Sequence, residues 1–253
     1  MKKQFLTYLL VAILPVCLLA QGNQPINNTD SKGLKQGRWI ELNNSLESSG
    51  DYVNNMKNGM WITHFQDNNM LYKIENFEMD KKQGVFIELS KRGSLVSEQY
   101  FTNDMPDGPV RQYAPNGLLL SSGNYRQGVL HGIQTSYYEN MQSKKSEEST
   151  FSNGVKDGPS RWFNTEGAVI AEYIYSNGML QGEQKSFYNG EKVRTLETYL
   201  NNIQEGPSIE YFENGQIKIN GQYKNGLKEG NWMEYDESGK LIKSVSYSKG
   251  NLR

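Results

Sequence analysis

A large aromatic residue recurs through this chain at nearly constant spacing, and each copy is followed three positions later by Gly, Asn or Asp. The nine aromatics are Tyr52, Phe77, Phe101, Tyr125, Phe151, Tyr175, Tyr199, Tyr223 and Tyr247. A glycine stands seven positions after each of the first eight, and Gly37 opens this series of glycines. The steps between the glycines are 22, 25, 24, 24, 26, 24, 24 and 24 residues. A period of this kind is the signature of a repeat architecture.

Each copy of the repeat divides into two short strands. In the copy from Gly206 to Gly230, we predict strands near Ser208–Phe212 and Gln216–Tyr223, with a hairpin turn at Asn214-Gly215 between them. A second turn at Lys224-Asn225-Gly226 leads into the next copy. No segment after the N-terminal region shows sustained apolar periodicity of 3.6 residues. The sequence therefore predicts an all-β fold: an elongated array of about nine β-hairpins forming a single twisted antiparallel sheet.

The recurrent positions have structural interpretations. The aromatic rings are expected to stack on one face of the sheet as a packing ladder. The Gly, Asn or Asp that follows each ring favours a left-handed backbone, so a tight turn is expected there. The apolar fraction of 36% is low for a compact protein of 253 residues. It suits a stack in which each repeat contacts only its neighbours.

The N-terminus predicts export. Lys2 and Lys3 precede an almost entirely apolar run from Phe5 to Ala20, which is typical of a secretory signal peptide covering residues 1–20 and is short for a membrane-spanning helix. The expected location is periplasmic or extracellular, with no membrane insertion after cleavage. A lipoprotein anchored through Cys17, the only cysteine, is disfavoured because Val16 precedes it where a small residue is usual.

Residues 21–36 are polar and rich in turn formers, and we interpret them as a flexible tether before a repeat domain spanning residues 37–253. Cleavage removes Lys2 and Lys3 from the 27 basic residues, which leaves 25 against 28 acidic ones. No block of Lys or Arg stands out. This balance argues against a nucleic-acid partner.

No pattern of catalytic or metal-binding residues is present. His64 and His131 lie in different repeats without a nearby Cys or second His, and no phosphate-binding loop or nucleophile motif occurs. Acidic residues recur in the turns, as at Asp80, Asp104 and Asp107, but one acid per turn does not make a calcium site. We therefore predict that the protein is not an enzyme and has no catalytic, cofactor-binding or metal-binding residues.

The copy from Tyr223 to Leu241, YKNGLKEGNWMEYDESGKL, resembles the MORN-repeat variant found in bacteria. The resemblance extends from Gly37 to Arg253. It implies a platform for interactions that carries no catalytic residues of its own. Some proteins with this repeat are labelled as antitoxins.

From these observations we predict an exported, non-enzymatic scaffold that mediates protein–protein interaction. The alternatives are a cell-envelope glycan-binding module and an antitoxin-like inhibitor of a partner protein. We expect the binding face to lie opposite the aromatic ladder, with the residue five positions after each opening glycine on the ladder side. The candidate binding residues occupy the sixth position or, for Trp162, the fourth: Phe65, Tyr138, Trp162, Tyr188 and Phe212. The alternative for these rings is that they cover a second apolar layer.

Overall fold

The computed structural model of the chain describes residues 26–189 and 192–253. The expected signal peptide (residues 1–20), with Cys17, and residues 21–25 of the expected tether lie outside the described residues and stay predictions. Within the described ranges, no helix is long and apolar enough to cross a membrane.

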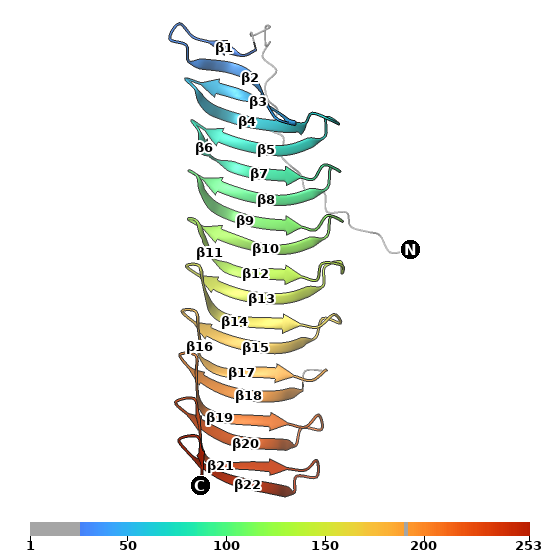
Figure 1. Ribbon diagram of the computed structural model, residues 1–253, viewed down its shortest axis with the longest axis vertical. Helices are drawn as coiled ribbons and strands as arrows, with labels where there is room; N and C mark the ends of the chain where they lie inside the picture. The colour runs from blue at the N-terminus through green and yellow to red at the C-terminus, as the bar shows by residue number, and fades with distance from the viewer. Residues whose placement is uncertain (1–25, 190–191) are drawn as a thin grey trace, which may run out of the picture.

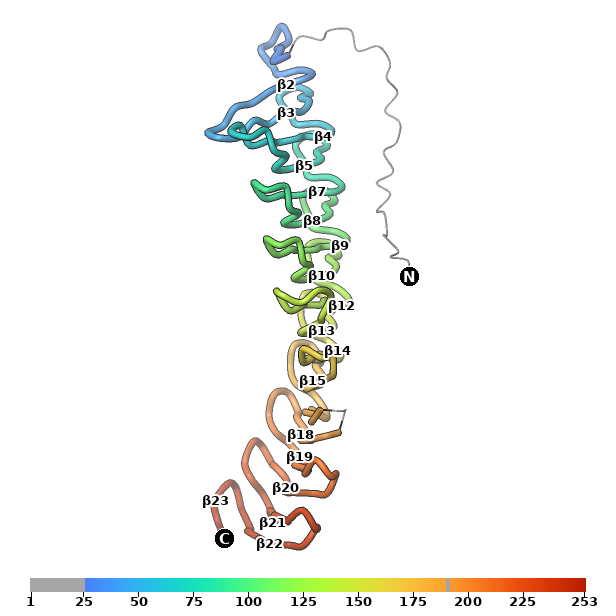
Figure 2. The backbone as a smooth tube through the Cα atoms, turned by 90° about the vertical axis from the view of Figure 1, so that its right-hand side faces the viewer, coloured from blue at the N-terminus to red at the C-terminus, as the bar shows by residue number. Residues whose placement is uncertain are grey.

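The described residues form one antiparallel sheet, in which the strands pair in chain order (Figure 1). Seen from its edge, the sheet is a single long layer of successive hairpins (Figure 2). The predicted all-β repeat array is confirmed. The strands are β1 (Asn28–Thr29), β2 (Lys35–Asn43), β3 (Leu46–Val53), β4 (Met56–Phe65), β5 (Leu71–Glu78), β6 (Lys81–Lys82), β7 (Gly84–Leu89), β8 (Leu95–Thr102), β9 (Met105–Tyr113), β10 (Leu119–Arg126), β11 (Val129–Leu130), β12 (Gly132–Tyr137), β13 (Lys145–Ser152), β14 (Val155–Phe163), β15 (Val169–Ser176), β16 (Met179–Leu180), β17 (Gly182–Phe187), β18 (Val193–Leu200), β19 (Ile203–Tyr211), β20 (Ile217–Lys224), β21 (Leu227–Tyr235), β22 (Leu241–Ser248) and β23 (Asn251–Leu252).

The sheet begins before Gly37, inside the segment expected to be a tether. Strand β1 pairs with the start of β2, with Asn28 opposite Gln36 and Thr29 opposite Lys35. The Trp39 indole N–H also donates to the Asn28 carbonyl, at 3.2 Å. Residues 28–36 therefore belong to the sheet as its first, short hairpin.

Nine two-residue turns line one long edge of the sheet, on the left in Figure 1, which we call the turn edge. Both residues of each turn have positive φ, as at Asn225 (51°) and Gly226 (75°). This is the type I′ geometry that matches the twist of paired strands. The left-handed backbone predicted at the Gly, Asn or Asp position is confirmed in all nine copies.

The turns also bond to the preceding repeat. Asn202 N donates to the Leu180 carbonyl at 3.1 Å, while Asn202 Oδ1 accepts from Leu180 N at 2.6 Å. Asn55, Asp80 and Asp104 make the same two-way contact with Lys35, Lys57 and Lys82. Where the facing residue is Pro106, which has no N–H to donate, the turn residue is Gly128, whose own N–H donates to the Pro106 carbonyl at 2.7 Å. We call this contact the turn clasp.

The opening glycines mark β-bulges that bend the strands. Between β8 and β9, Gln99 pairs with Val110 and Phe101 pairs with Pro106, so three residues of β9 lie opposite Tyr100 alone. Gly108, in the middle of these three, has a φ of 120°. All nine opening glycines have positive φ, a conformation that residues with a Cβ rarely adopt.

The other long edge, which we call the loop edge, absorbs the unequal repeat lengths. The shortest step, of 22 residues, has the two-residue connection Asn44-Ser45. The longest step, of 26 residues, has the loop from Tyr138 to Lys144, closed by a 2.9 Å bond from Tyr138 N to the Lys144 carbonyl. Insertions are therefore accommodated at the loop edge, while the turn edge keeps a constant geometry.

Candidate functional site

The two faces of the sheet are identified by strand pairing. Each ladder aromatic pairs with the opening glycine of its own repeat, as Tyr52 pairs with Gly37. Because side chains alternate along a strand, the second, fourth and sixth positions after that glycine share the ladder aromatic's face, which we call the ladder face. The third and fifth positions lie on the opposite face, which we call the reverse face.

At its N-terminal end, the ladder face carries a cluster of packed rings. Tyr52 lies edge-on between Trp39 and Trp61, with ring centroids 5.8 Å and 5.0 Å away. Trp61, only 1% exposed, lies directly over Gly50, where an added Cβ would come within 2.3 Å of the indole. Gly221 and Trp232 repeat this arrangement near the C-terminus, again at 2.3 Å.

Lysines two positions before an opening glycine cover many of these rings. Lys35 Nζ lies 4.6 Å and 4.5 Å from the Trp39 and Tyr52 ring centroids. Lys57, Lys82, Lys156 and Lys228 lie over two rings each in the same way. The alkyl stems and ammonium groups thus occupy ring faces that a ligand would need, which favours a packing role for the ladder.

Ionic hydrogen bonds accompany the rings. Glu41 accepts from Lys35 Nζ at 2.6 Å and from the Tyr52 hydroxyl at 3.0 Å. The hydrogen bond to Glu41 raises the pKa of Lys35, and burial together with Glu41 raises the pKa of Tyr52. Burial, assisted by the Glu197 carboxylate, raises the pKa of Tyr199 to about 12. These shifts keep the groups in their ordinary protonation states, which does not suit a general acid or base near neutral pH.

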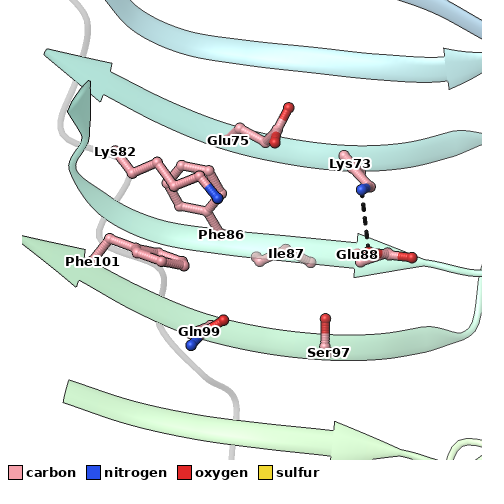
Figure 3. A pocket seen from close by; sticks show the side chains of 9 residues that line it. All are labelled: Lys73, Glu75, Lys82, Phe86, Ile87, Glu88, Ser97, Gln99 and Phe101. Atoms are coloured by element: carbon pink, nitrogen blue, oxygen red, sulfur yellow. Dashed lines mark ion pairs between the residues drawn. The ribbon is translucent and has the colours of Figure 1, made fainter. Parts of the chain in front are cut away.

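Two shallow hollows on the ladder face are built from equivalent repeat positions. The first, of about 160 Å³, lies beside Phe86 and Phe101, with Lys82 over both rings and a 3.3 Å ion pair between Lys73 and Glu88 (Figure 3). The second, of about 120 Å³, has Lys228, Trp232, Glu234 and Tyr247 at the corresponding positions. Both are smaller than the roughly 300 Å³ at which small-molecule pockets begin.

The acidic and amide residues along the turn edge are engaged in backbone bonds. The residue before an opening glycine accepts from the next turn, as Glu205 does from Asn225 N at 2.6 Å and Glu229 from Lys249 N at 2.7 Å. His131 lines an open polar hollow of about 370 Å³ with Arg126 and Asn153. Among the described residues, no three His, Cys, Asp or Glu side chains are grouped so that they would hold a metal ion.

The expected placement of the candidate residues was wrong: Phe65, Tyr138, Trp162, Tyr188 and Phe212 lie on the ladder face. Lys156 Nζ shows this directly, because it lies 5.2 Å from the Trp162 ring and 5.3 Å from the ladder ring Tyr175. The fifth-position residues are the ones on the reverse face. A single-layer sheet needs apolar packing on both of its faces. The recurrence of a large side chain at one position in every copy therefore did not identify the face on which that position lies.

The candidate residues are spread along the array, and each makes packing or backbone contacts. Phe65 is buried against Tyr72, with centroids 4.7 Å apart. The hydroxyls of Tyr138 and Tyr188 donate to the next repeat, to the carbonyls of Phe163 (2.6 Å) and Tyr211 (2.8 Å). Trp162 packs edge-on against Tyr173 at 5.0 Å, and Lys218 lies 6.0 Å from the Phe212 ring centroid. Binding of a partner by these residues stays a prediction, and their contacts favour the packing alternative.

The reverse face carries an apolar stripe made of the fifth-position residues, which were expected on the ladder side. We call it the fifth-position stripe. From the third to the ninth repeat, each fifth-position residue pairs across to the following strand, mostly with Leu, Val or Ile, as Phe163 pairs with Val169 and Phe187 with Val193. Its fifth-position members are Leu89, Tyr113, Tyr137, Phe163, Phe187, Tyr211 and Tyr235, all half-buried. In the part of the chain that the structure describes, no second layer covers them.

Comparison with known families agrees with this geometry. Residues 204–225 and 228–249 match the family model described as MORN repeat variant. These two adjacent repeats are MORN repeat variants. Each matched segment contains an opening glycine and a ladder residue, Tyr223 or Tyr247, of the kind that recur through the rest of the sheet, and ends at the first residue of the turn that follows. MORN repeats are generally protein- or membrane-interaction motifs and are typically non-catalytic. No curated protein matches the chain.

Proposed function

We propose that this chain is an exported, non-enzymatic MORN-repeat scaffold that binds a partner protein through the fifth-position stripe of its reverse face. The observation that supports the proposal most is the length of that uncovered stripe, from Leu89 to Tyr235. Extended apolar patches with polar borders mark interaction sites on soluble proteins. Export rests on the N-terminal sequence alone.

The border of the stripe suits a protein partner. Next to the middle of the stripe, on the reverse face, charged side chains pair with one another, including Glu98 with Arg111 at 3.3 Å and Arg161 with Glu172 at 2.5 Å. At the two ends of the stripe the equivalent positions are apolar: Ile87, Ile209 and Met233. An apolar centre bordered by polar groups, as in the middle of this stripe, is the usual anatomy of a protein interface. The rings alternate with aliphatic side chains such as Val169 and Val193, which fits apolar protein side chains better than sugar hydroxyls.

Adjacent residues on opposite faces provide a matched test. In one variant, Phe187→Ser with Tyr211→Ser, two rings of the reverse face are lost. In the control, Tyr188→Ser with Phe212→Ser, the neighbouring rings of the ladder face are lost from the residues immediately after the same strands, β17 and β19. Each tagged protein is used to capture partners from the native envelope fraction, and thermal melts establish which variants remain folded.

We expect the reverse-face variant to stay folded and to lose capture of a partner that the wild type retains. The ladder-face variant should lose stability, because its hydroxyl and ring contacts join neighbouring repeats. Loss of capture by a folded ladder-face variant alone would instead support the surface predicted from the sequence. Retention of capture by both folded variants would reject both surfaces.

A further inference from the structure

One repeat lacks a hydrogen bond that recurs along the turn edge. In seven repeats, a side-chain oxygen of the residue before the opening glycine accepts from the backbone N–H of the first residue of the next turn. The acceptors, at 2.6–3.4 Å, are Asn58, Gln83, Asp107, Asp157, Gln181, Glu205 and Glu229. In the fifth repeat this position is His131, and none of the described residues accepts from the corresponding donor, Asn153 N.

The missing acceptor coincides with the open polar hollow at this place on the turn edge, which has a volume of about 370 Å³. The hollow is lined by residues of two successive turns and of the strand between them: Arg126, Gln127, Val129, His131 and Asn153. Backbone bonds fix its walls, because His131 N donates to the Asn124 carbonyl and Gly154 N to the Leu130 carbonyl, both at 2.9 Å. A ligand would therefore meet a preformed site, with a volume inside the roughly 300–1,000 Å³ of small-molecule sites.

The last two turns form an equivalent hollow with different chemistry. That hollow, of about 240 Å³, is lined by residues at the corresponding repeat positions: Lys224, Asn225, Leu227, Glu229 and Lys249. Glu229 stands where the fifth repeat has His131, and its carboxylate accepts from Lys249 N at 2.7 Å. The backbone at this position therefore binds a carboxylate when the chain itself supplies one. In the fifth repeat the chain supplies none.

The groups around the fifth-repeat hollow suit an anion. Arg126 contributes a guanidinium, which binds carboxylates with two parallel hydrogen bonds, and it takes part in none of the ion pairs of the described residues. The His131 imidazole has an N–H to donate in either protonation state, and Asn153 N is a further donor. Asp107 of the preceding repeat is not among the lining residues, and its carboxylate is bound to Gln127 N at 3.3 Å.

We infer that this hollow binds the carboxylate group of a ligand, in the place that Glu229 fills in the last repeat. The oxygens of that carboxylate would accept from Asn153 N, Arg126 and His131. Val129 is the apolar side chain of the hollow, and it would contact the carbon atoms that carry the carboxylate. The ligand class is therefore an organic acid, either a small molecule or an acidic residue of a polypeptide.

Two-dimensional amide NMR spectra of the purified protein test the inference, with succinate added at constant ionic strength. We expect the Asn153 amide signal and the Arg126 Nε–H signal to shift and to saturate. The Lys249 amide should stay unchanged, because Glu229 already bonds to it. Arg126→Gln should weaken succinate binding about tenfold, since it removes a charge-assisted hydrogen bond.

Exchanging the residues of the two hollows gives matched variants with opposite expected results. His131→Glu restores the internal acceptor for Asn153 N, so it should abolish succinate binding and leave the melting temperature equal or higher. Loss of binding in this variant would therefore not reflect unfolding. Glu229→His removes the acceptor from Lys249 N and should create a second succinate site beside Lys224.

Two further probes identify the source of the carboxylate. A shift of the Asn153 amide by inorganic phosphate but not by succinate would overturn the choice of a carboxylate. An acetylated, amidated peptide with one internal glutamate is the other probe: tighter binding than succinate assigns the site to a polypeptide, and weaker binding assigns it to a small organic acid. The absence of any saturable shift at Asn153 would overturn the inference, as would succinate binding by the His131→Glu variant. None of these results bears on capture of a partner through the fifth-position stripe.

Discussion

The N-terminal repeats and the later, central repeats share one backbone arrangement but differ in the side chain at the second position after the opening glycine. Two residues after the opening glycine, the first three repeats have Trp39, Trp61 and Phe86, and the ninth has Trp232. The sixth, seventh and eighth repeats have Ser160, Gln184 and Ser208 in that place. The fold therefore requires the bulge and the ladder ring in every repeat, whereas the second-position side chain can be aromatic or polar.

Trp61 and Gln184 show how two different side chains meet one requirement. Both are almost fully buried, and both direct an N–H group at backbone carbonyls: Trp61 Nε1 at Asp51 (3.3 Å), and Gln184 Nε2 at Ile174, Gln181 and Gly182 (3.2–3.3 Å). Gln184 Oε1 also accepts from Ile174 N at 2.8 Å. The bulge leaves backbone polar groups without ladder partners, and in these two repeats a donor at the second position satisfies them, whereas Ser160 Oγ and Trp232 Nε1 at the same position make no hydrogen bond.

The largest expected difference between the regions comes from removing the second-position side chain. Trp61→Ala deletes an indole that is 1% exposed, and we expect a loss of about 4 kcal/mol in the free energy of unfolding. Ser160→Ala is the central counterpart. Its hydroxyl is 0% exposed and has no hydrogen-bond partner, so the change should be within about 1 kcal/mol and in the stabilising direction. Urea melts of both variants measure this, and equal losses would contradict the distinction.

Adding a methyl group to the glycine beneath the second position is the next largest effect. Gly50→Ala forces the new Cβ to within 2.3 Å of the Trp61 indole, and we expect a cost of about 2 kcal/mol from overpacking. Gly123→Ala, at the corresponding place in the centre, meets Gln134 at an ordinary 3.5 Å and should change stability by less than about 0.5 kcal/mol. Thermal melts compare the two, and a neutral Gly50→Ala would mean that Trp61 moves freely.

A smaller effect should follow from changing the turn clasp, which both regions use. Asn202→Gly keeps the positive φ but loses the 2.6 Å bond from Leu180 N, so stability should fall by about 1 kcal/mol. Gly178→Asn supplies the equivalent acceptor to Lys156 N and should raise stability by about 0.5 kcal/mol. Urea melts decide the matter. If both changes are neutral, the side-chain half of the clasp adds nothing to the turn.

The smallest expected effect concerns pH. Tyr199 has a pKa near 12 in the folded chain against 10.0 when unfolded, and the pKa of Tyr52 is also raised. Because the folded state holds these protons more tightly, the stabilisation is complete below pH 10 and is lost as the pH rises towards 12. Each tyrosine should contribute at most about 1 kcal/mol after solvent screening. Tyr199→Phe and Tyr52→Phe should each flatten the alkaline fall in urea midpoints, and a fall of unchanged steepness would refute this origin.

The sequence was sufficient for the architecture because its strongest signals are local. Asn225-Gly226 specifies a turn, Gly206 specifies a bulge, and Tyr223 recurs with both, so strand number and order follow from counting copies. The assignment of faces was not local. It depends on the pairing of Tyr223 with Gly206, 17 residues earlier in the chain. This pairing decides on which face of the sheet each of the other side chains in the hairpin lies.

Two kinds of contact have a signal in the sequence that was not among the predictions. Gly50 precedes Trp61 by eleven residues, and Gly221 precedes Trp232 by the same interval, a spacing that places each glycine beneath an indole on the neighbouring strand. The lysine two residues before an opening glycine is also visible in five copies. The candidate residues Tyr138 and Tyr188 were chosen because they vary between repeats, yet their hydroxyls bond to the following repeat. Variation along an array therefore reflects alternative packing as readily as it reflects binding.

The turn clasp also has a consequence for how the chain reaches its final form. Each turn closes onto a residue of the repeat before it, as Asn202 does onto Leu180 and Asp104 onto Lys82, so every new hairpin has a finished template behind it. Each hairpin can then fold without the residues that follow it in the chain, and the stack can lengthen one hairpin at a time from its N-terminal end. Such growth suits a polypeptide that is delivered N-terminus first, as threading through a narrow translocation channel would require.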